Sequence, residues 1–366
     1  MEIEVTQEKL TKALNIVSRV AIGKVTLPIL NNVLIRVDKN KATLTTTNLD
    51  MAVVDFLPVS IAKDGVITVP AKLLAEFVNN LPKEEQIKIT TKGTKVEIIA
   101  GKYSSVINGA KADDFPELPE INEKEAVIFK MGIEEFKNGL NQVMIASSHD
   151  MTRPALTGVF FNTNNKILAV AATDGYRLAE KKMISGVDSE VMAIVPTDSL
   201  QEVMRSINEE MEEIEISFNK DLVRFRLGEV EIISKLIDAS FPDYRKLIPK
   251  DNDIKVKIKR EELIRVTKLA SLFARSVGGS IICQAKKENI FLVKSVANEF
   301  GENDSKIETK IEKEGKITLN SRFLLDVLNV LNESEINFEF TNHIAPIVLR
   351  NQKNKDYTHI IMPLNS

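Results

Sequence analysis

The chain has 366 residues, about two and a half times a typical domain of roughly 150 residues, and 43% of them are hydrophobic. The 49 Lys and Arg residues nearly balance the 52 Asp and Glu residues, so the formal charge of −3 gives no net basic signature of nucleic-acid binding. One cysteine, Cys283, excludes an intrachain disulfide framework and a thiolate zinc site, and no apolar run approaches the ~20 residues that span a bilayer, so we expect a soluble cytoplasmic protein.

The chain opens with a strand–helix–strands unit. Residues 2–6 alternate between polar and apolar as a strand does, and residues 7–20 place an apolar stripe at helical spacing. Two alternating segments, 33–37 and 42–46, follow. A similar unit comes next, with a strand at 65–70, a helix at 71–81 and strands at 86–90 and 95–99. The N-terminal third therefore consists of two similar units.

The same succession recurs along the rest of the chain. The predicted strand–helix pairs are 126–130 with 133–146, 191–196 with 200–207, 254–258 with 261–274, and 316–320 with 323–331. The six units begin near residues 3, 66, 126, 191, 254 and 316, at intervals of 63, 60, 65, 63 and 62 residues. This regularity predicts six related units.

Two proline-containing segments mark the joints between pairs of units. Residues 114–119 and 240–244 each follow a completed pair, and proline favours an extended connector there. We therefore predict an α+β fold of three repeated domains, covering residues 1–120, 126–245 and 250–366.

Six helices of about 10 Å diameter, laid side by side in a circle, leave a hole of only about 9 Å, whereas the twelve helices of two copies leave about 28 Å. The wider bore would admit a nucleic-acid duplex. Counted with their flanking residues, over 6–20, 71–81, 132–148, 197–208, 259–275 and 320–331, the six predicted helical segments together carry a charge of +3 and the rest of the chain −6. This is consistent with ordinary solvated helix faces, or with a basic lining that binds phosphates without reading bases.

The search for catalytic residues finds little. The three histidines, His149, His343 and His359, lack the i, i+4 spacing of a helical metal pair, and Cys283 lies in an apolar segment typical of a core. The run 147–150 contains the residue types of a catalytic triad, but such triads are assembled across a fold, so a polar loop is the simpler interpretation.

The segment Thr173-Asp-Gly-Tyr-Arg-Leu-Ala179 has two interpretations. An Asp-Gly pair adopts a positive φ at little steric cost, which is typical of a turn between strands. Alternatively, Arg177 and Leu178 could line a groove.

Five stretches carry a family resemblance: 26–34 (TLPILNNVL), 153–158 (RPALTG), 173–179 (TDGYRLA), 241–249 (FPDYRKLIP) and 357–364 (YTHIIMPL). With these stretches in this order and spacing, the chain resembles the bacterial sliding clamps, the beta subunits of DNA polymerase III, over essentially its whole length. The resemblance implies repeated clamp domains in a head-to-tail homodimeric ring around duplex DNA, with helices inside and antiparallel sheets outside. It implies a non-catalytic processivity factor with no cofactor and no metal.

The resemblance also implies partners. They are double-stranded DNA bound without regard to sequence, the DNA polymerase III catalytic subunit, an ATP-dependent clamp loader, and other proteins that carry a clamp-binding motif. Topological tethering would turn polymerase rebinding into an intramolecular event. An alternative is a protein-binding ring that does not enclose DNA, and a less favoured one is an enzyme with a composite active site.

Three sets of site residues follow from the resemblance. The partner-peptide groove would comprise Leu156, Thr173, Gly175, Arg177, Leu178, Pro242, Leu247, Ile344, Pro346, Ile360, Met362, Pro363 and Leu364. Arg177 would make a polar contact at its rim. DNA-facing residues would be Lys24, His149, Arg153, Arg205 and Lys246. The dimer interface would include Val106, Leu272 and Phe273.

The sequence departs from the family at four places. Pro154-Ala155 replaces an aromatic pair seen in some members. Lys24 stands where arginine is common, which loses bidentate phosphate geometry but keeps the charge. Asp198 lies where basic residues are common and would repel phosphate. The ending Asn365-Ser366 replaces a basic-apolar one.

Overall fold

The computed structural model describes residues 1–21, 27–39, 41–184, 186, 189–350 and 356–364. It divides into two compact units, one made of Met1–Ile133 with Asp198–Leu236 and the other of Glu134–Thr197 with Ile237–Ser366. Among the described residues, no helix is both long and apolar enough to cross a membrane.

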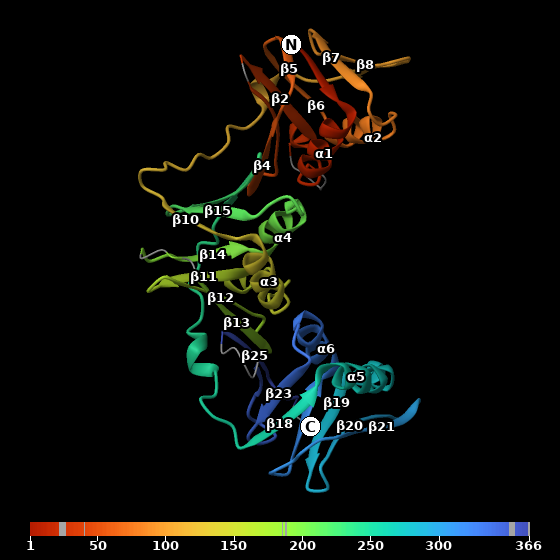
Figure 1. The fold of residues 1–366 in the computed structure, drawn as a ribbon, viewed down its shortest axis with the longest axis vertical. Coiled ribbons are helices and arrows are strands. Elements are labelled where there is room, and N and C mark those ends of the chain that lie inside the picture. Colours follow the sequence, from red (N-terminus) through yellow and green to blue (C-terminus); the bar gives the residue numbers. More distant parts are fainter. Residues whose placement is uncertain (22–26, 40, 185, 187–188, 351–355, 365–366) are drawn as a thin grey trace. The chain divides into compact units, whose positions relative to one another are not determined.

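The six predicted helices are present in the described part of the chain (Figure 1). They are α1 (Gln7–Val17), α2 (Ala71–Asn79), α3 (Ile133–Met144), α4 (Thr197–Ser206), α5 (Arg260–Ala274) and α6 (Ser321–Val330). Each buries an apolar stripe; in α1 it consists of Leu10, Ala13, Leu14 and Val17. Helix α1 packs against α2, and α5 against α6.

The first compact unit contains two antiparallel sheets. One has the order β5 (Ser60–Lys63), β1 (Glu2–Thr6), β7 (Gln86–Lys92), β8 (Lys95–Ala100), β9 (Tyr103–Asn108). The other has the order β10 (Val127–Gly132), β15 (Glu213–Phe218), β16 (Leu222–Leu227), β17 (Val230–Lys235), β4 (Met51–Leu57), β3 (Lys41–Thr47), β2 (Asn32–Asp38), β6 (Gly65–Pro70).

The second compact unit repeats this plan. Its eight-stranded sheet has the order β14 (Met192–Pro196), β11 (Gly158–Asn164), β12 (Ile167–Thr173), β13 (Arg177–Ile184), β25 (Tyr357–Ile361), β24 (Ile347–Arg350), β23 (Glu335–Phe340), β18 (Ile254–Lys259). Its four-stranded sheet has the order β21 (Gly301–Glu308), β20 (Ile290–Ala297), β19 (Ser280–Lys286), β22 (Gly315–Asn320). The predicted α+β class with repeated units is confirmed.

Strand exchange explains why the units occur in pairs. In each pair, the strand that precedes one helix joins the strands that follow the other helix: β1 pairs with β7, and β6 pairs with β2. The same holds for β10 with β15 and β14 with β11, and for β18 with β23 and β22 with β19. A single unit therefore cannot complete its own sheet.

Each helix is followed by a third strand beyond the two that the repeated pattern predicted, and α1 is also followed by the short strand β5. The third strands are β4, β9, β13, β17, β21 and β25. Strand β4 shows why some were missed, because it is buried at four consecutive residues and so lacks the alternation of a half-buried strand. These third strands make the longest-range pairings, β17 with β4 and β13 with β25.

Candidate functional site

The segment Thr173–Ala179 forms a turn between β12 and β13 that is held by its own side chains. The Asp174 carboxylate accepts hydrogen bonds from the backbone N–H groups of Tyr176 and Arg177, both at 2.9 Å. The Thr173 hydroxyl donates to the Arg177 carbonyl at 2.7 Å, and Gly175 has φ of 90°. The turn interpretation is therefore correct, and the turn also fixes the direction of the Arg177 side chain.

Arg177 connects this turn to helix α6. Its Nε lies 3.0 Å from Asp174 Oδ2 and its Nη1 lies 2.6 Å from Asp326 Oδ2. The guanidinium lies over the Phe323 ring, 4.5 Å from the centroid. The residue is only 8% exposed. Arg177 was expected at a polar rim; in the structure its guanidinium is paired with two carboxylates and so connects β13 to α6.

An apolar cluster lies behind the turn. It is formed by Ala171, Leu178, Tyr244, Val348 and Ile360, with three partly buried side chains packed against it. Leu178 and Ile360 are opposite each other on β13 and β25, and Val348 is the next partner across the sheet. Two of the predicted groove residues, Leu178 and Ile360, therefore belong to a buried floor supplied by four strands and the short 3₁₀ helix Tyr244–Leu247.

The other predicted groove residues belong to the same compact unit. Leu247, Ile344 and Met362 are exposed apolar side chains, with Met362 at 41%. Gly175 and Pro242 are also exposed, whereas Leu156, Pro346, Pro363 and Leu364 are half-buried and Thr173 is buried.

Two backbone hydrogen bonds fix the C-terminal segment near the turn. The Met362 N–H donates to the Tyr176 carbonyl at 2.8 Å, and the Leu364 N–H donates to the Thr318 carbonyl at 2.9 Å. The atypical ending Asn365-Ser366 lies outside the described residues.

A polar recess of about 310 Å³ adjoins the same turn. It is lined by Ser147, Ser148, His149, Asp150, Arg153, Asp174, Tyr176, Arg177, Arg322 and Phe323. Two of the predicted DNA-facing residues, His149 and Arg153, are exposed and share this recess.

The remaining predicted DNA-facing residues belong to different elements. Arg205 is exposed in the last turn of α4, and Asp198 is exposed in its first turn. Lys246 is exposed and forms an ion pair of 2.7 Å with Asp243, which is worth little at a surface. Lys24 lies outside the described residues.

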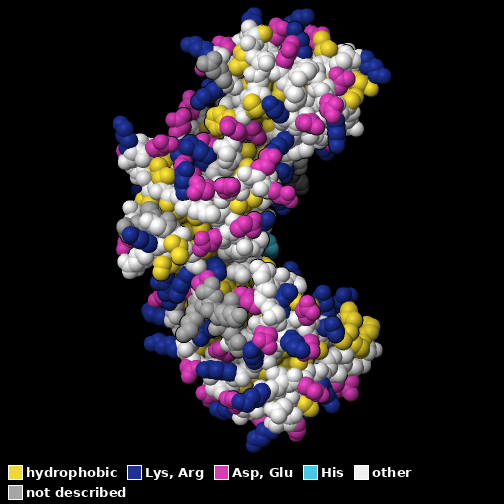
Figure 2. Space-filling view, viewed as in Figure 1, with side chains coloured by type: hydrophobic (Ala, Val, Ile, Leu, Met, Phe, Trp, Pro, Cys, Tyr) yellow, Lys and Arg dark blue, Asp and Glu magenta, His cyan; other side chains and the backbone are white. Residues whose placement is uncertain are grey.

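The basic charge that the sequence places on the helical segments is partly neutralised. Arg19 Nε donates to Glu202 at 2.7 Å, and Lys12 lies 3.3 Å from Glu210. Arg265 and Lys268 on α5 remain exposed. Figure 2 shows basic and acidic side chains interspersed over the face in view, as the small net charge indicates.

The predicted interface residues lie on exposed surfaces. Val106 is 58% exposed on β9, one of the two edge strands of its sheet. Leu272 is 54% exposed on α5 and Phe273 is half-buried. Exposed hydrophobic side chains gather over α5 in Figure 2, where Leu269 is also exposed.

Comparison with known proteins gives a consistent match along the whole chain. Models of the DNA polymerase III beta subunit match its N-terminal domain at residues 1–119, its central domain at 130–243 and its C-terminal domain at 245–365. The beta sliding clamp of Staphylococcus aureus is 26% identical and covers 100% of both chains.

Comparison with solved structures indicates the same family. The sliding clamp of Bacillus subtilis has a TM-score of 0.96 at 26% identity and covers 100% of this chain and 99% of its own. The sliding clamp from Bartonella birtlesii, the DNA polymerase III subunit beta bound to griselimycin, has a TM-score of 0.94 at 30% identity, and 100% of both chains is covered. The chain belongs to the bacterial sliding clamps, the DNA polymerase III beta subunit family.

The sliding clamp is the non-catalytic processivity subunit of DNA polymerase III. In this clamp, burial raises the pKa of the Cys283 thiol to about 12, so the group stays protonated at neutral pH. Burial, aided by Arg177, lowers the pKa of His359 to about 3, so its imidazole stays neutral. Among the described residues, no group of three or more His, Cys, Asp or Glu side chains could hold a metal ion.

Sequence reasoning missed three clamp residues beside the predicted groove: Asp326, Phe323 and Arg322. They lie on α6, about 150 positions from the turn they meet. The alternation of apolar and polar residues within α6 carries no signal of this contact, because it records only which side of the helix is buried.

Proposed function

We propose that two copies of this sliding clamp associate head to tail into a closed ring around duplex DNA and tether the replicative polymerase there. Edge strands β9 and β21 carry the proposal. Each stands at one end of its sheet and, in the part of the chain that the structure describes, has a neighbouring strand on one side only.

The way the third strands pair within the chain suggests which strands pair with the free edges of β9 and β21. Within the chain, β17 pairs with β4 and β25 pairs with β13, so the last strand of a second unit meets the last strand of a first unit. Strand β9 ends the first pair's second unit, and β21 ends the third pair's first unit. Extending the rule to a second copy joins β9 of one protomer to β21 of its partner, which is a head-to-tail contact.

The side chains at β9 favour such an interface. Its sequence, YSSVIN, carries no charge and no proline, the devices that usually protect a sheet edge. The opposite edge of the same sheet, β5, has only four residues and ends in Lys63. Val106 would supply an apolar contact on β9, and Leu272 with Phe273 would supply one from α5.

DNA would be held mainly by enclosure. A ring of twelve helices has a bore of about 28 Å, wide enough for a duplex, whereas six helices leave about 9 Å. His149, Arg153, Arg205 and Lys246 would make sequence-independent contacts with phosphates, together with Lys24. Ion pairs such as Lys246–Asp243 reduce the free positive charge.

Partner proteins would bind the predicted groove through a short peptide with apolar anchors. The polymerase catalytic subunit, an ATP-dependent clamp loader and other proteins with a clamp-binding motif would compete for it. Leu178 and Ile360 would form the floor, with Leu247, Ile344 and Met362 exposed to contact the anchors. Arg177 would act indirectly, by holding the turn against α6.

Three clamp domains at 1–120, 126–245 and 250–366 and a cytoplasmic location complete the proposal. The strand exchange within each pair of units supports the domains, because the strand that precedes each helix pairs with a strand from the other unit of the same pair.

Loading onto circular and linear DNA tests the enclosure. A clamp loader would place the ring on a nicked circular plasmid, and gel filtration would then separate bound from free clamp. We expect the clamp to stay on the circle and to leave once a restriction enzyme linearises it. Equal retention on both forms would mean binding by contact, and no retention on either would favour a protein-binding ring that does not enclose DNA.

A further inference from the structure

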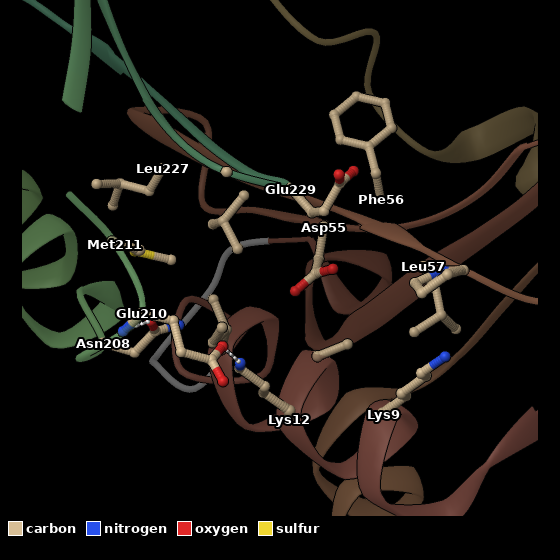
Figure 3. Close-up of a pocket in the computed structure, with 15 residues that line it drawn as sticks. Lys9, Lys12, Asp55, Phe56, Leu57, Asn208, Glu210, Met211, Leu227 and Glu229 are labelled. Atoms are coloured by element: carbon tan, nitrogen blue, oxygen red, sulfur yellow. Dashed lines mark hydrogen bonds and ion pairs between the residues drawn. The ribbon is translucent and has the colours of Figure 1, made fainter. Parts of the chain in front are cut away.

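The first compact unit contains a cavity of about 350 Å³ that shares no residue with the predicted groove, DNA-facing or interface sets. It lies between α1, the end of β4, the segment around Met211 and the hairpin that joins β16 to β17 (Figure 3). Its apolar lining includes Ala13, Ile16, Leu57, Met211, Leu227 and Val230.

A carboxylate points into this apolar cavity. Asp55 sits in β4 with Leu44 and Val230 as its strand partners, on the same side of the strand as Val53 and Leu57. The residue is 7% exposed, and among the described residues its carboxylate has no hydrogen bond or ion pair. Figure 3 shows the carboxylate directed into the cavity toward α1.

Leaving this carboxylate unpaired is costly. Burial raises the pKa of the Asp55 carboxyl to about 6; the nearby Glu229 adds to the shift and Lys12 opposes it. Lys12 forms its ion pair with Glu210, at 3.3 Å, and not with Asp55; the side chains of Lys12 and Glu210 are both exposed. The remaining charged group of the lining, Lys9, is exposed. Buried carboxylates are normally paired, so the arrangement lacks a cation.

We propose that the cavity binds a guanidinium or ammonium group carried on an apolar body, presented by a peptide segment of a partner protein. The cation would pair with Asp55, and the apolar body would contact Ile16, Met211 and Leu227. The charges of the lining favour a cationic ligand, because three carboxylates, Asp55, Glu210 and Glu229, outnumber the two lysines, Lys9 and Lys12. A volume of about 350 Å³ is at the small end for ligand sites, which fits a basic side chain with one apolar neighbour.

The test titrates the full-length protein with acetylated, amidated Phe-Arg-Leu at pH 7.5 and follows the methyl resonance of Met211. The comparison peptide replaces arginine by citrulline, which has nearly the same shape and no charge. We expect the arginine peptide to shift the Met211 signal and to bind at least about ten-fold more tightly, as a charge-assisted hydrogen bond allows. Asp55→Asn should abolish the difference, and Asp50→Asn, a change at an exposed residue just before β4, should preserve it.

Equal affinity for the two peptides would overturn the proposal, and this comparison uses the unaltered protein, so it does not depend on the folding of a variant. Arginine selectivity that persists in Asp55→Asn would overturn the assignment to Asp55. Ethylguanidinium serves as a third probe. If it binds as tightly as the peptide, the apolar body contributes nothing and the peptide source is wrong.

Discussion

Replacing Asp55 by asparagine is expected to stabilise the first compact unit, and to do so more strongly at pH 8 than at pH 4.5. The pKa of the carboxyl rises from 3.8 to about 6 because the group is buried beside Glu229. The folded protein therefore binds this proton more tightly than the unfolded chain does. Stability is lost as the pH rises between these two values.

The size of the expected stabilisation follows from the pKa shift of Asp55. About 2 pKa units at ~1.36 kcal/mol each give a penalty of about 3 kcal/mol for the ionised carboxylate at pH 8. At pH 4.5 the carboxyl is protonated in the folded protein and mostly ionised in the unfolded chain, and the same linkage relation gives about 1 kcal/mol. The variant's gain should therefore be about 2 kcal/mol larger at pH 8.

Differential scanning calorimetry of the parent and the variant at both pH values measures this gain. For a unit of this size the thermal midpoint should rise about 4–8 °C more at pH 8 than at pH 4.5. Asp50→Asn is the matched control, because Asp50 is exposed and only weakly paired with Lys235. A pH-independent shift in Asp55→Asn would refute the claim that an unpaired buried charge is present.

The other predictions concern the interface, the groove and the core. Leu272→Ala with Phe273→Ala should give monomers in sedimentation, because both apolar contacts of α5 are lost; a dimer mass would count against the interface assignment. Met362→Ala should weaken partner-peptide binding in a fluorescence titration and leave the dimer intact, since the side chain is exposed beside the buried floor; unchanged affinity would remove it from the groove. Cys283 should react with iodoacetamide only in denaturant, because burial raises the thiol pKa to about 12; rapid alkylation of the native protein would contradict this.

Local periodicity was enough to find the six helices. The predicted helix at 261–274 differs from α5, Arg260–Ala274, by one residue, because an apolar stripe such as Leu263, Val266 and Ala270 is visible within a short window. The third strands were harder to recognise. Strand β4 is covered on both faces, so its residues do not alternate.

The resemblance named the groove residues, and the structure places them in one compact unit, but their burial depends on tertiary contacts. Leu178 and Ile360 are equally apolar in sequence to Met362, yet the first two are buried floor and the last is exposed. Arg177 gave no sign that Asp326 would hold it, since the two are 149 residues apart.

The sequence by itself determined the repeated units, the positions of the helices and membership of a family. The tertiary structure decided which strands exchange between units, which edges stay unpaired and which charges are left without a partner. The difference between what the sequence determines and what the tertiary structure determines has a physical cause. Helical and strand periodicity is set by neighbours a few residues apart, whereas the pairing of β17 with β4, or the isolation of Asp55, depends on residues brought together from distant parts of the chain.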